Sequence, residues 1–305
     1  MSAQTDYVLK TVEERGVRFV RLWFTDVLGF LKSFAITPAE LEAALEEGMT
    51  FDGSAIEGYS RVQESDMLAV PDATTFEILP WGDGDTPVAR IFCDITRISG
   101  EPFAGDPRQV LKRNLDRARE MGFTFYAGPE MEFFYFENSS STIPLDHAGF
   151  FDLTQHDMVS SLRKKTIMTL EALGIPVEYS FHELGPSQHE IDLRYTDALN
   201  MADNVMTFRL AVKEVAAELG VYATFMPKPI AGDFGSGMHT HFSLFEGDEN
   251  AFYDPRDPAG LSKTGQAFIA GLLKHAREIT AVTNQWVNSY KRLNVRYESP
   301  AYVCW

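Results

Sequence analysis

The first hundred residues alternate between hydrophobic and polar positions in short runs that fit strands packed around one helix. The predicted elements are a helix over 5–15, strands over 17–24 and 30–36 joined by a turn near Gly29, a helix from Pro38 to Gly48, and strands over 76–79 and 88–95. Thr37 and Glu40 have the spacing of a capping box at the start of the second helix. Mixed strands around one helix predict a small α+β domain over residues 1–103.

Beyond a linker rich in glycine and proline at 100–107, longer amphipathic segments alternate with apolar ones. The predicted helices run from Asp106 to about Gly122 and over 155–174, 197–219 and 262–281, and the predicted strands cover 124–136, 177–183, 188–195, 222–226 and 238–245. This order predicts an α/β domain over residues 104–305. We expect its strands to form one curved antiparallel sheet.

Composition and charge argue against several classes of partner and site. The 305 residues carry a formal net charge of −17, which argues against nucleic acid or an anionic membrane surface as a partner because the field of the molecule repels both. The start of the chain lacks the pattern of a signal peptide, and no run approaches the roughly 20 apolar residues of a membrane span, so we expect a cytoplasmic protein. Two cysteines, Cys93 and Cys304, do not indicate a disulfide framework or a thiolate metal site.

Candidate metal ligands lie in three of the predicted strand segments. In the run 128–136 the period of a strand places Glu130 and Glu132 on one face, where two carboxylates repel each other unless a cation lies between them. Glu183 and Glu190 flank a turn, and His239 follows the flexible segment 235–237. Carboxylates with one imidazole favour Mg²⁺ or Mn²⁺ over structural zinc, and this number of ligands is compatible with two ions that handle phosphate oxygens.

Each of these signals has an ordinary structural explanation when taken alone. A Glu-x-Glu strand is more often a solvated face than a metal site, a histidine pair is commonly surface or satisfied core, and paired glycines are frequent in loops. The order of all three segments along one chain makes the combined metal site the better hypothesis.

A set of longer motifs gives the chain a resemblance to the bacterial type I glutamine synthetases, in particular their actinobacterial paralogues. The resemblance runs from about residue 8 to the end and includes Phe51-Asp52-Gly53-Ser54-Ala55-Ile56-Glu57-Gly58, Glu64-Ser65-Asp66, Gly128-Pro129-Glu130-Met131-Glu132-Phe133, the segment from Glu183 to Glu190, Met226-Pro227-Lys228-Pro229, Gly235-Ser236-Gly237-Met238-His239-Thr240-His241 and Asn288-Ser289-Tyr290-Lys291-Arg292-Leu293.

The resemblance implies an ATP-dependent ligase that makes glutamine from glutamate and ammonium through γ-glutamyl phosphate, with a β-grasp-like domain before the catalytic domain. It implies a first divalent ion on Glu132, Glu183 and Glu190 and a second on Glu130 and His239. The residues implied at the nucleotide are Glu178, His241 and Ser243.

The resemblance also assigns the other substrates. Asp52 and Asp66 match the pair that binds ammonium, and Asp52 also matches the base that frees ammonia for attack. Gly235, Arg292 and Glu298 match substrate-binding positions; Arg292 also stabilises the transferred phosphoryl group, and Glu298 belongs to a flap over the glutamate site. A turn or helix-cap role for the two aspartates is the structural alternative.

Three features depart from the family pattern. Phe234 stands where the family usually has asparagine, and Arg296 replaces a glycine of the flap. The family also continues for roughly a further third of its length, with arginines and a glutamate that complete the site. We therefore expect a catalytic domain incomplete at its C-terminus, with little or no synthetic activity from the 305 residues alone.

Other functions stay open at this point. Within the enzyme class, a γ-glutamyl ligase for polyamines or another amine also suits an acidic mouth. Outside it, a non-catalytic binding or assembly subunit explains the shorter chain, and a two-metal phosphoesterase explains the carboxylates but not the Asp52 segment. The resemblance further implies a homo-oligomer, a dodecamer in the family, in which one subunit supplies Asp52 and Asp66 to its neighbour.

Overall fold

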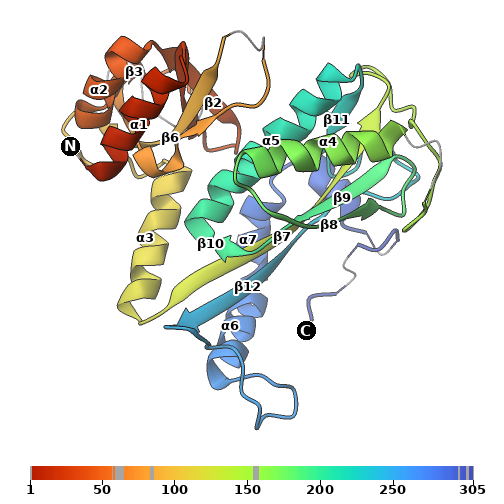
Figure 1. The fold of residues 1–305 in the computed structure, drawn as a ribbon. Coiled ribbons are helices and arrows are strands. Elements are labelled where there is room, and N and C mark those ends of the chain that lie inside the picture. The colour runs from red at the N-terminus through yellow and green to blue at the C-terminus, as the bar shows by residue number, and fades with distance from the viewer. Residues whose placement is uncertain are drawn as a thin grey trace. The chain divides into compact units, whose positions relative to one another are not determined.

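The computed structural model describes residues 2–56, 58, 65–82, 86–153, 158–294, 296–299 and 302–304, and Figure 1 shows the ribbon. Contacts between Cα atoms divide the chain into two compact units, Met1–Arg117 and Ala118–Trp305. Helix α3 (Pro107–Glu120) passes from one unit into the other. The domain boundary between residues 103 and 104 stays a prediction.

The first unit is built on a twisted sheet with the strand order β2-β1-β6-β4-β3, and β5 pairs with β6. The strands are β1 (Phe19–Thr25), β2 (Leu31–Ile36), β3 (Met49–Asp52), β4 (Asp66–Pro71), β5 (Glu77–Ile78) and β6 (Val88–Arg97). β1 pairs with β6 in parallel, and its pairing with β2 is the predicted hairpin. Helices α1 (Ala3–Glu14) and α2 (Pro38–Glu47) bury Val8, Leu41 and Ala44 against this sheet. β3 and β4 were not predicted.

The capping box predicted for α2 is wrong in one respect. Thr37 is the N-cap, but its side chain makes no capping hydrogen bond; instead the backbone N–H of Glu40 donates to the Thr37 carbonyl at 3.1 Å. The end of the helix agrees with prediction, because Gly48 has a φ of 78°, a left-handed value that glycine adopts without strain. Asp106 caps α3 as predicted, accepting from the backbone N–H of Arg108 at 3.0 Å.

The second unit contains the larger sheet, which has the order β13-β12-β7-β9-β8, with β10 and β11 both paired to β7. Its strands are β7 (Thr124–Phe136), β8 (Val177–His182), β9 (Gln188–Leu193), β10 (Thr196–Asp197), β11 (Tyr222–Thr224), β12 (Met238–Glu246) and β13 (Glu249–Asn250). Every pairing among them is antiparallel, as predicted.

Helices α4 (Met158–Ala172) and α5 (Ala198–Glu218) lie side by side against this sheet (Figure 1). The long strand β7 turns Phe133 and Tyr135 into the apolar core, and Phe133 packs against Phe208 of α5 with ring centroids 6.1 Å apart. Because side chains alternate along a strand, Glu130 and Glu132 occupy the opposite face. The fold therefore leaves one face of β7 for polar chemistry.

The helix predicted over 262–281 is interrupted. It forms α6 (Lys263–Lys274) and α7 (Ala276–Thr283), because His275 leaves the helical region with a φ of −104° and a ψ of 14°. A further short helix, α8 (Val287–Arg292), was not predicted. Across the described residues, each helix is too short or too polar to cross a bilayer.

Candidate functional site

Strand register gathers the acidic side chains of the second unit on one face of the sheet. In the antiparallel pair of β7 and β9, Glu132 lies directly opposite Glu190, and Glu130 lies opposite Asp192. On the other side of β7, His239 of β12 lies opposite Glu130. Directly opposite residues have Cβ atoms about 4.5–5.5 Å apart, so these side chains are near neighbours although up to 109 residues separate them in sequence.

A cavity of about 290 Å³ opens on this face. The residues that line it are Glu130, Glu132, Phe150, Phe181, Glu183, Leu184, Gln188, Glu190, Asp192, Phe234, Gly235, His239, Arg292, Tyr297 and Glu298. It brings together all five predicted metal ligands and the three residues expected to bind substrate. Their individual roles stay predictions.

Glu132 is held by hydrogen bonds from two donors. Its Oε2 accepts from Gln188 Nε2 at 2.8 Å and from the backbone N–H of Gly237 at 3.0 Å. Gln188 is 1% exposed, and it also donates to the Gly235 carbonyl at 3.1 Å and accepts from Gly185 N–H at 2.9 Å. Gln188 therefore fixes Glu132 and the glycine segment together, a role that sequence reasoning missed because a lone glutamine carries no charge signal.

Burial, together with neighbouring negative charge, raises the pKa of the carboxyls of Glu190 and Glu132. Glu190 is 5% exposed, and burial, then the carboxylates of Asp192, Glu132 and Glu183, raises its pKa to about 10. Burial likewise raises the pKa of Glu132. Both effects penalise the ionised form, and a divalent cation among these oxygens reverses the penalty. The donor set of carboxylates and one imidazole fits a hard divalent ion.

Glu130 has a different environment. Its two oxygens face ring nitrogens of His239, at 3.2 Å, and of His241. The hydrogen bond from His241 lowers the pKa of Glu130, so this carboxyl is ionised. Because Nδ1 of His239 faces Glu130, its Nε2 is the nitrogen left for a ligand, the usual orientation of a metal-binding histidine.

The glycine segment allows close approach at the edge of the cavity. A Cβ on Gly237 would lie 2.7 Å from Arg292 Nη2 and 2.9 Å from Glu132 Oε1, and one on Gly235 would lie 2.4 Å from the Pro227 carbonyl oxygen. Helix α8 supplies Arg292. Asn288 of the same helix exchanges two hydrogen bonds with the backbone of Lys228, at 2.6 and 3.0 Å. The preceding residue, Pro227, accepts from the Ser236 N–H at 2.9 Å, so α8 is linked to the glycine segment through residues 227 and 228.

Of the departures from the family pattern, Phe234 lines the cavity and Arg296 directly precedes the lining residue Tyr297. The ring of Phe234 meets Tyr297 edge-on with centroids 5.7 Å apart, and Lys228 Nζ lies 4.2 Å from the centroid of Tyr297. Tyr297 and Glu298, which follow Arg296, have left-handed φ values of 60° and 57°. Such values are uncommon outside glycine and mark this segment as strained.

The remaining predicted residues lie elsewhere. Asp52 and Asp66 belong to the first unit, where β3 and β4 place them directly opposite each other. Asp52 accepts from Ser54 N–H at 2.8 Å, and hydrogen bonding to Ser54 lowers the pKa of its exposed carboxyl. Glu178, His241 and Ser243 are on β8 and β12 but do not line the cavity. Motif residues Glu57 and Glu64 lie outside the described residues.

Asp146, His182 and His189 form a second cluster, on the opposite face of β8 and β9, with ligand atoms close enough together for a metal ion. His182 directs Nε2 at Asp146 Oδ1 (2.8 Å) and Nδ1 at the Glu183 carbonyl (2.7 Å), so both nitrogens act as donors. Arg163 Nη1 donates to His189 Nδ1 at 2.6 Å, which leaves the His189 proton on Nε2. A cation there would meet that proton and the guanidinium. This cluster is therefore better described as a hydrogen-bonded ionic network.

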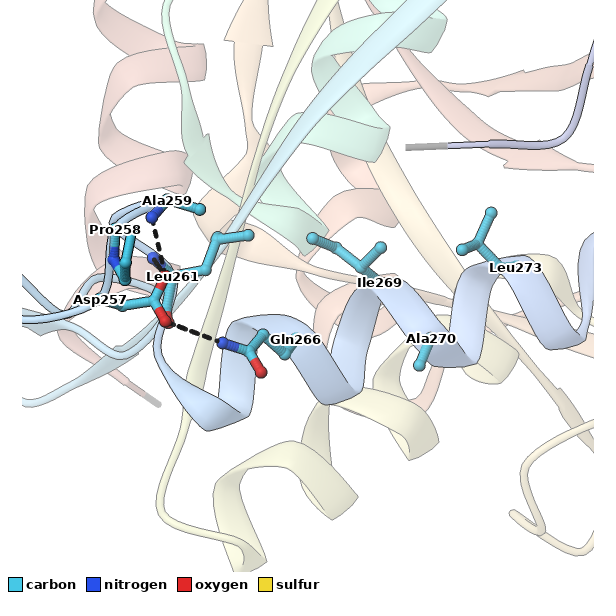
Figure 2. A pocket seen from close by; sticks show the side chains of 8 residues that line it. All are labelled: Asp257, Pro258, Ala259, Leu261, Gln266, Ile269, Ala270 and Leu273. Carbon is cyan, nitrogen blue, oxygen red and sulfur yellow. Dashed lines mark hydrogen bonds between the residues drawn. The ribbon is translucent and has the colours of Figure 1, made fainter.

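Another hollow, of about 440 Å³, lies between α6 and the preceding loop (Figure 2). It is lined largely by apolar side chains such as Ile269 and Leu273, while Asp257 and Gln266 face each other across a 3.4 Å hydrogen bond. It lacks the converging polar groups of the carboxylate cavity, so the latter is the candidate functional site.

Comparison with known proteins agrees with this architecture. Residues 16–98 match the glutamine synthetase β-grasp domain, and residues 104–305 match the glutamine synthetase catalytic domain. A glutamine synthetase of Mycobacterium bovis is 58% identical over 311 aligned residues, which cover 100% of this chain and 70% of the relative, and one of Thermotoga maritima is 49% identical over 98% of this chain and 69% of the relative.

Solved structures give the same result. A cryo-EM structure of Plasmodium falciparum glutamine synthetase superposes with a TM-score of 0.87 at 28% identity, covering 96% of this chain and 64% of that one. The chain thus spans about two thirds of the length of its relatives. With both domain matches, it belongs to the glutamine synthetase family. By family it is an enzyme of the ATP-dependent ligase class, with the β-grasp and catalytic domains that the sequence predicted.

Proposed function

We propose that the protein joins glutamate and ammonium to form glutamine, with ATP as the source of energy. The observation that carries this proposal is the convergence of Glu130, Glu132, Glu183, Glu190 and His239 with Arg292 on one cavity. Identity of 58% to a protein named glutamine synthetase supports it.

The chemistry requires two steps. A γ-carboxylate does not react with an amine directly because oxide is not a viable leaving group. An oxygen of the glutamate γ-carboxylate first attacks the γ-phosphorus of ATP, and ADP leaves, which gives γ-glutamyl phosphate. Ammonia then attacks the γ-carbonyl carbon, phosphate leaves, and a proton passes from nitrogen to a base.

The carboxylate cavity suits the first step. When bound, Mg²⁺ or Mn²⁺ would neutralise the crowded phosphate oxygens. We assign Glu132, Glu183 and Glu190 to one ion and Glu130 with His239 to another. Glu178, His241 and Ser243 are proposed to contact the nucleotide. The guanidinium of Arg292, beside Glu132 at the cavity edge, would stabilise charge on the phosphoryl group.

The second step needs an ammonium site and protection from water. Asp52 and Asp66, opposite each other on β3 and β4, are proposed to bind the cation, and Asp52 to accept its proton. Gly235 and Glu298 line the cavity, where we expect Glu298 to cover bound glutamate and exclude water. By analogy with the family we expect a dodecameric homo-oligomer in which the aspartates serve a neighbouring subunit. The cytoplasmic location also stays a prediction.

Two measurements test the function. Calorimetry with Mn²⁺ and a non-hydrolysable ATP analogue is expected to detect both ligands, and Glu190→Gln is expected to weaken Mn²⁺ binding where Glu137→Gln, at an exposed position, does not. Phosphate release that depends on both glutamate and ammonium is the catalytic readout. Absence of cation and nucleotide binding would refute the proposal. Binding without phosphate release is the result expected of the 305 residues alone, and measurable release would refute the expectation that their catalytic domain is incomplete.

A second candidate is a γ-glutamyl ligase that uses a larger amine. The exposure of both Asp52 and Asp66 is compatible with it, because an open acidic pair accepts a polyamine as readily as ammonium. Comparing phosphate release with ammonium, putrescine, spermine and ethanolamine distinguishes the two, since the true acceptor is expected to give the highest kcat/KM.

A further inference from the structure

Asp192 shares the face of the sheet that carries the proposed metal ligands, yet it has no role in the function described so far. It lies two residues after Glu190 on β9 and directly opposite Glu130 on β7. The four carboxyls therefore form two successive rungs across these strands, Glu132 with Glu190 and Glu130 with Asp192. Alternation along each strand directs all four side chains to one side of the sheet.

The Asp192 carboxyl is buried with one oxygen unused. The residue is 9% exposed, lines the cavity, and its Oδ1 has no hydrogen-bond partner among the described residues. Buried polar atoms are paired in the great majority of cases, and an unpaired carboxylate oxygen carries a large desolvation cost. The exception calls for a partner that the protein chain itself does not provide.

A positively charged partner fits the surroundings. Glu130 lies directly opposite Asp192 on β7, Glu190 lies two residues before it on β9, and all three carboxyls line the cavity. Asp192 and Glu190 line the same cavity, so a cation bound by Glu190 would lie near the oxygens of Asp192. An anion or a neutral acceptor would be repelled at this position, whereas hard divalent cations bind six or more oxygen ligands and take them from such groups.

We propose that Asp192 is a ligand of the divalent-cation centre, contributing Oδ1 beside Glu130 and Glu190. This inference rests on the proposed function, since it assumes that the cavity binds Mg²⁺ or Mn²⁺. It adds a sixth side chain to the five that the family pattern assigns within these 305 residues. It also explains why an aspartate is buried between Glu190 on its own strand and Glu130 on the neighbouring strand.

A thiolate at position 192 gives a direct test of ligation. Asp192→Cys is prepared in a Cys304→Ser background, because Cys304 is exposed whereas Cys93 is fully buried. Titration with Cd²⁺ is expected to produce an ultraviolet sulfur-to-metal charge-transfer band that the Cys304→Ser parent lacks. A side chain that acts only through its charge, or that contacts the nucleotide, gives no such band.

Mn²⁺ affinity is the second readout. Asp192→Asn keeps the shape of the side chain and is expected to weaken Mn²⁺ binding by about 10- to 100-fold, while Asp254→Asn, a matched charge change on a surface loop, leaves it within about twofold. Both the band and the loss are required. If either is missing while the parent still binds Mn²⁺, the assignment of Asp192 is overturned; if the parent itself binds no Mn²⁺, the proposed function fails as well.

Discussion

Gln188 is expected to stabilise the cavity more than its neutral side chain suggests, and Gln188→Ala tests this. The side chain is buried and makes three hydrogen bonds, to Glu132 Oε2 (2.8 Å), the Gly235 carbonyl (3.1 Å) and the Gly185 N–H (2.9 Å). A hydrogen bond to a charged group contributes about 1.5–3 kcal/mol and a neutral one about 1 kcal/mol. Losing all three is therefore expected to lower the free energy of unfolding by about 4 kcal/mol.

The loss is expected to be local to the second unit, because every partner of Gln188 lies there. Urea unfolding of the metal-free protein, monitored by hydrogen exchange in peptides over 183–190 and 235–239, measures this loss. Because these peptides belong to the second unit, the readout is distinct from unfolding of the first unit. Gln266→Ala is the matched control, since Gln266 is exposed and its hydrogen bonds to Asp257 (3.4 Å) and to the Leu261 carbonyl (3.1 Å) are solvent-accessible. A decrease below about 1 kcal/mol for Gln188→Ala would show that the buried network is not cooperative, and the reasoning would fail.

Two further predictions concern the same cavity, and a third concerns the ionic network of Asp146 and His182. Gly235→Ala places a Cβ 2.4 Å from the Pro227 carbonyl oxygen, so we expect at least a tenfold loss of Mn²⁺ affinity by calorimetry, while Gly232→Ala, with nothing within 4 Å, retains it. Because Glu190 has a pKa of about 10 without metal, Mn²⁺ binding at pH 7 is expected to release about one proton, and calorimetry in buffers of different ionisation enthalpy measures it; equal apparent enthalpies would contradict it. In the ionic network, burial opposes ionisation, but hydrogen bonding outweighs it: the pKa of Asp146 is lowered to about 2 and the pKa of His182 is raised. The mutual stabilisation of the pair is therefore lost at low pH, as Asp146 is protonated between about 4 and 2. It is also lost as His182 loses its proton above about pH 6.5. A double-mutant cycle of Asp146→Asn and His182→Gln is expected to give a coupling of about 1–3 kcal/mol at pH 5.5 and a smaller one at pH 9; a coupling that does not change with pH would count against it.

The raised pKa values of Asp192 and Glu190 also make the stability of the metal-free protein depend on pH. Burial raises the folded-state pKa of Asp192 to about 6 and, with neighbouring carboxylates, that of Glu190 to about 10. The contribution of these groups is therefore fully present below pH 4 and is lost as pH rises through 6 toward 10. Added Mn²⁺ is expected to reverse this trend, because it favours the ionised forms.

The local pattern of hydrophobic and polar residues was sufficient to predict most helices and strands and to predict which side chains share a face of one strand. The period of two along β7 placed Glu130 and Glu132 together, and the five candidate ligands did converge on one cavity. The same local patterns also failed at single positions. Thr37 has the sequence of a capping box without its hydrogen bond, and the break at His275 has no glycine or proline to announce it. Asp192 was within reach of the same period-two argument from Glu190, but it was missed.

The sequence by itself determined the two-domain order, the strand faces and the set of candidate ligands, because backbone geometry fixes which side chains share a face within one strand. Only the tertiary structure decided which strands pair and in what register, since those contacts join segments far apart in the chain. The pairing of Glu132 with Glu190, the hold of Gln188 on Glu132, and the raised pKa of Glu190 all arise from that register. They depend on burial and on neighbours that no single segment of the sequence contains.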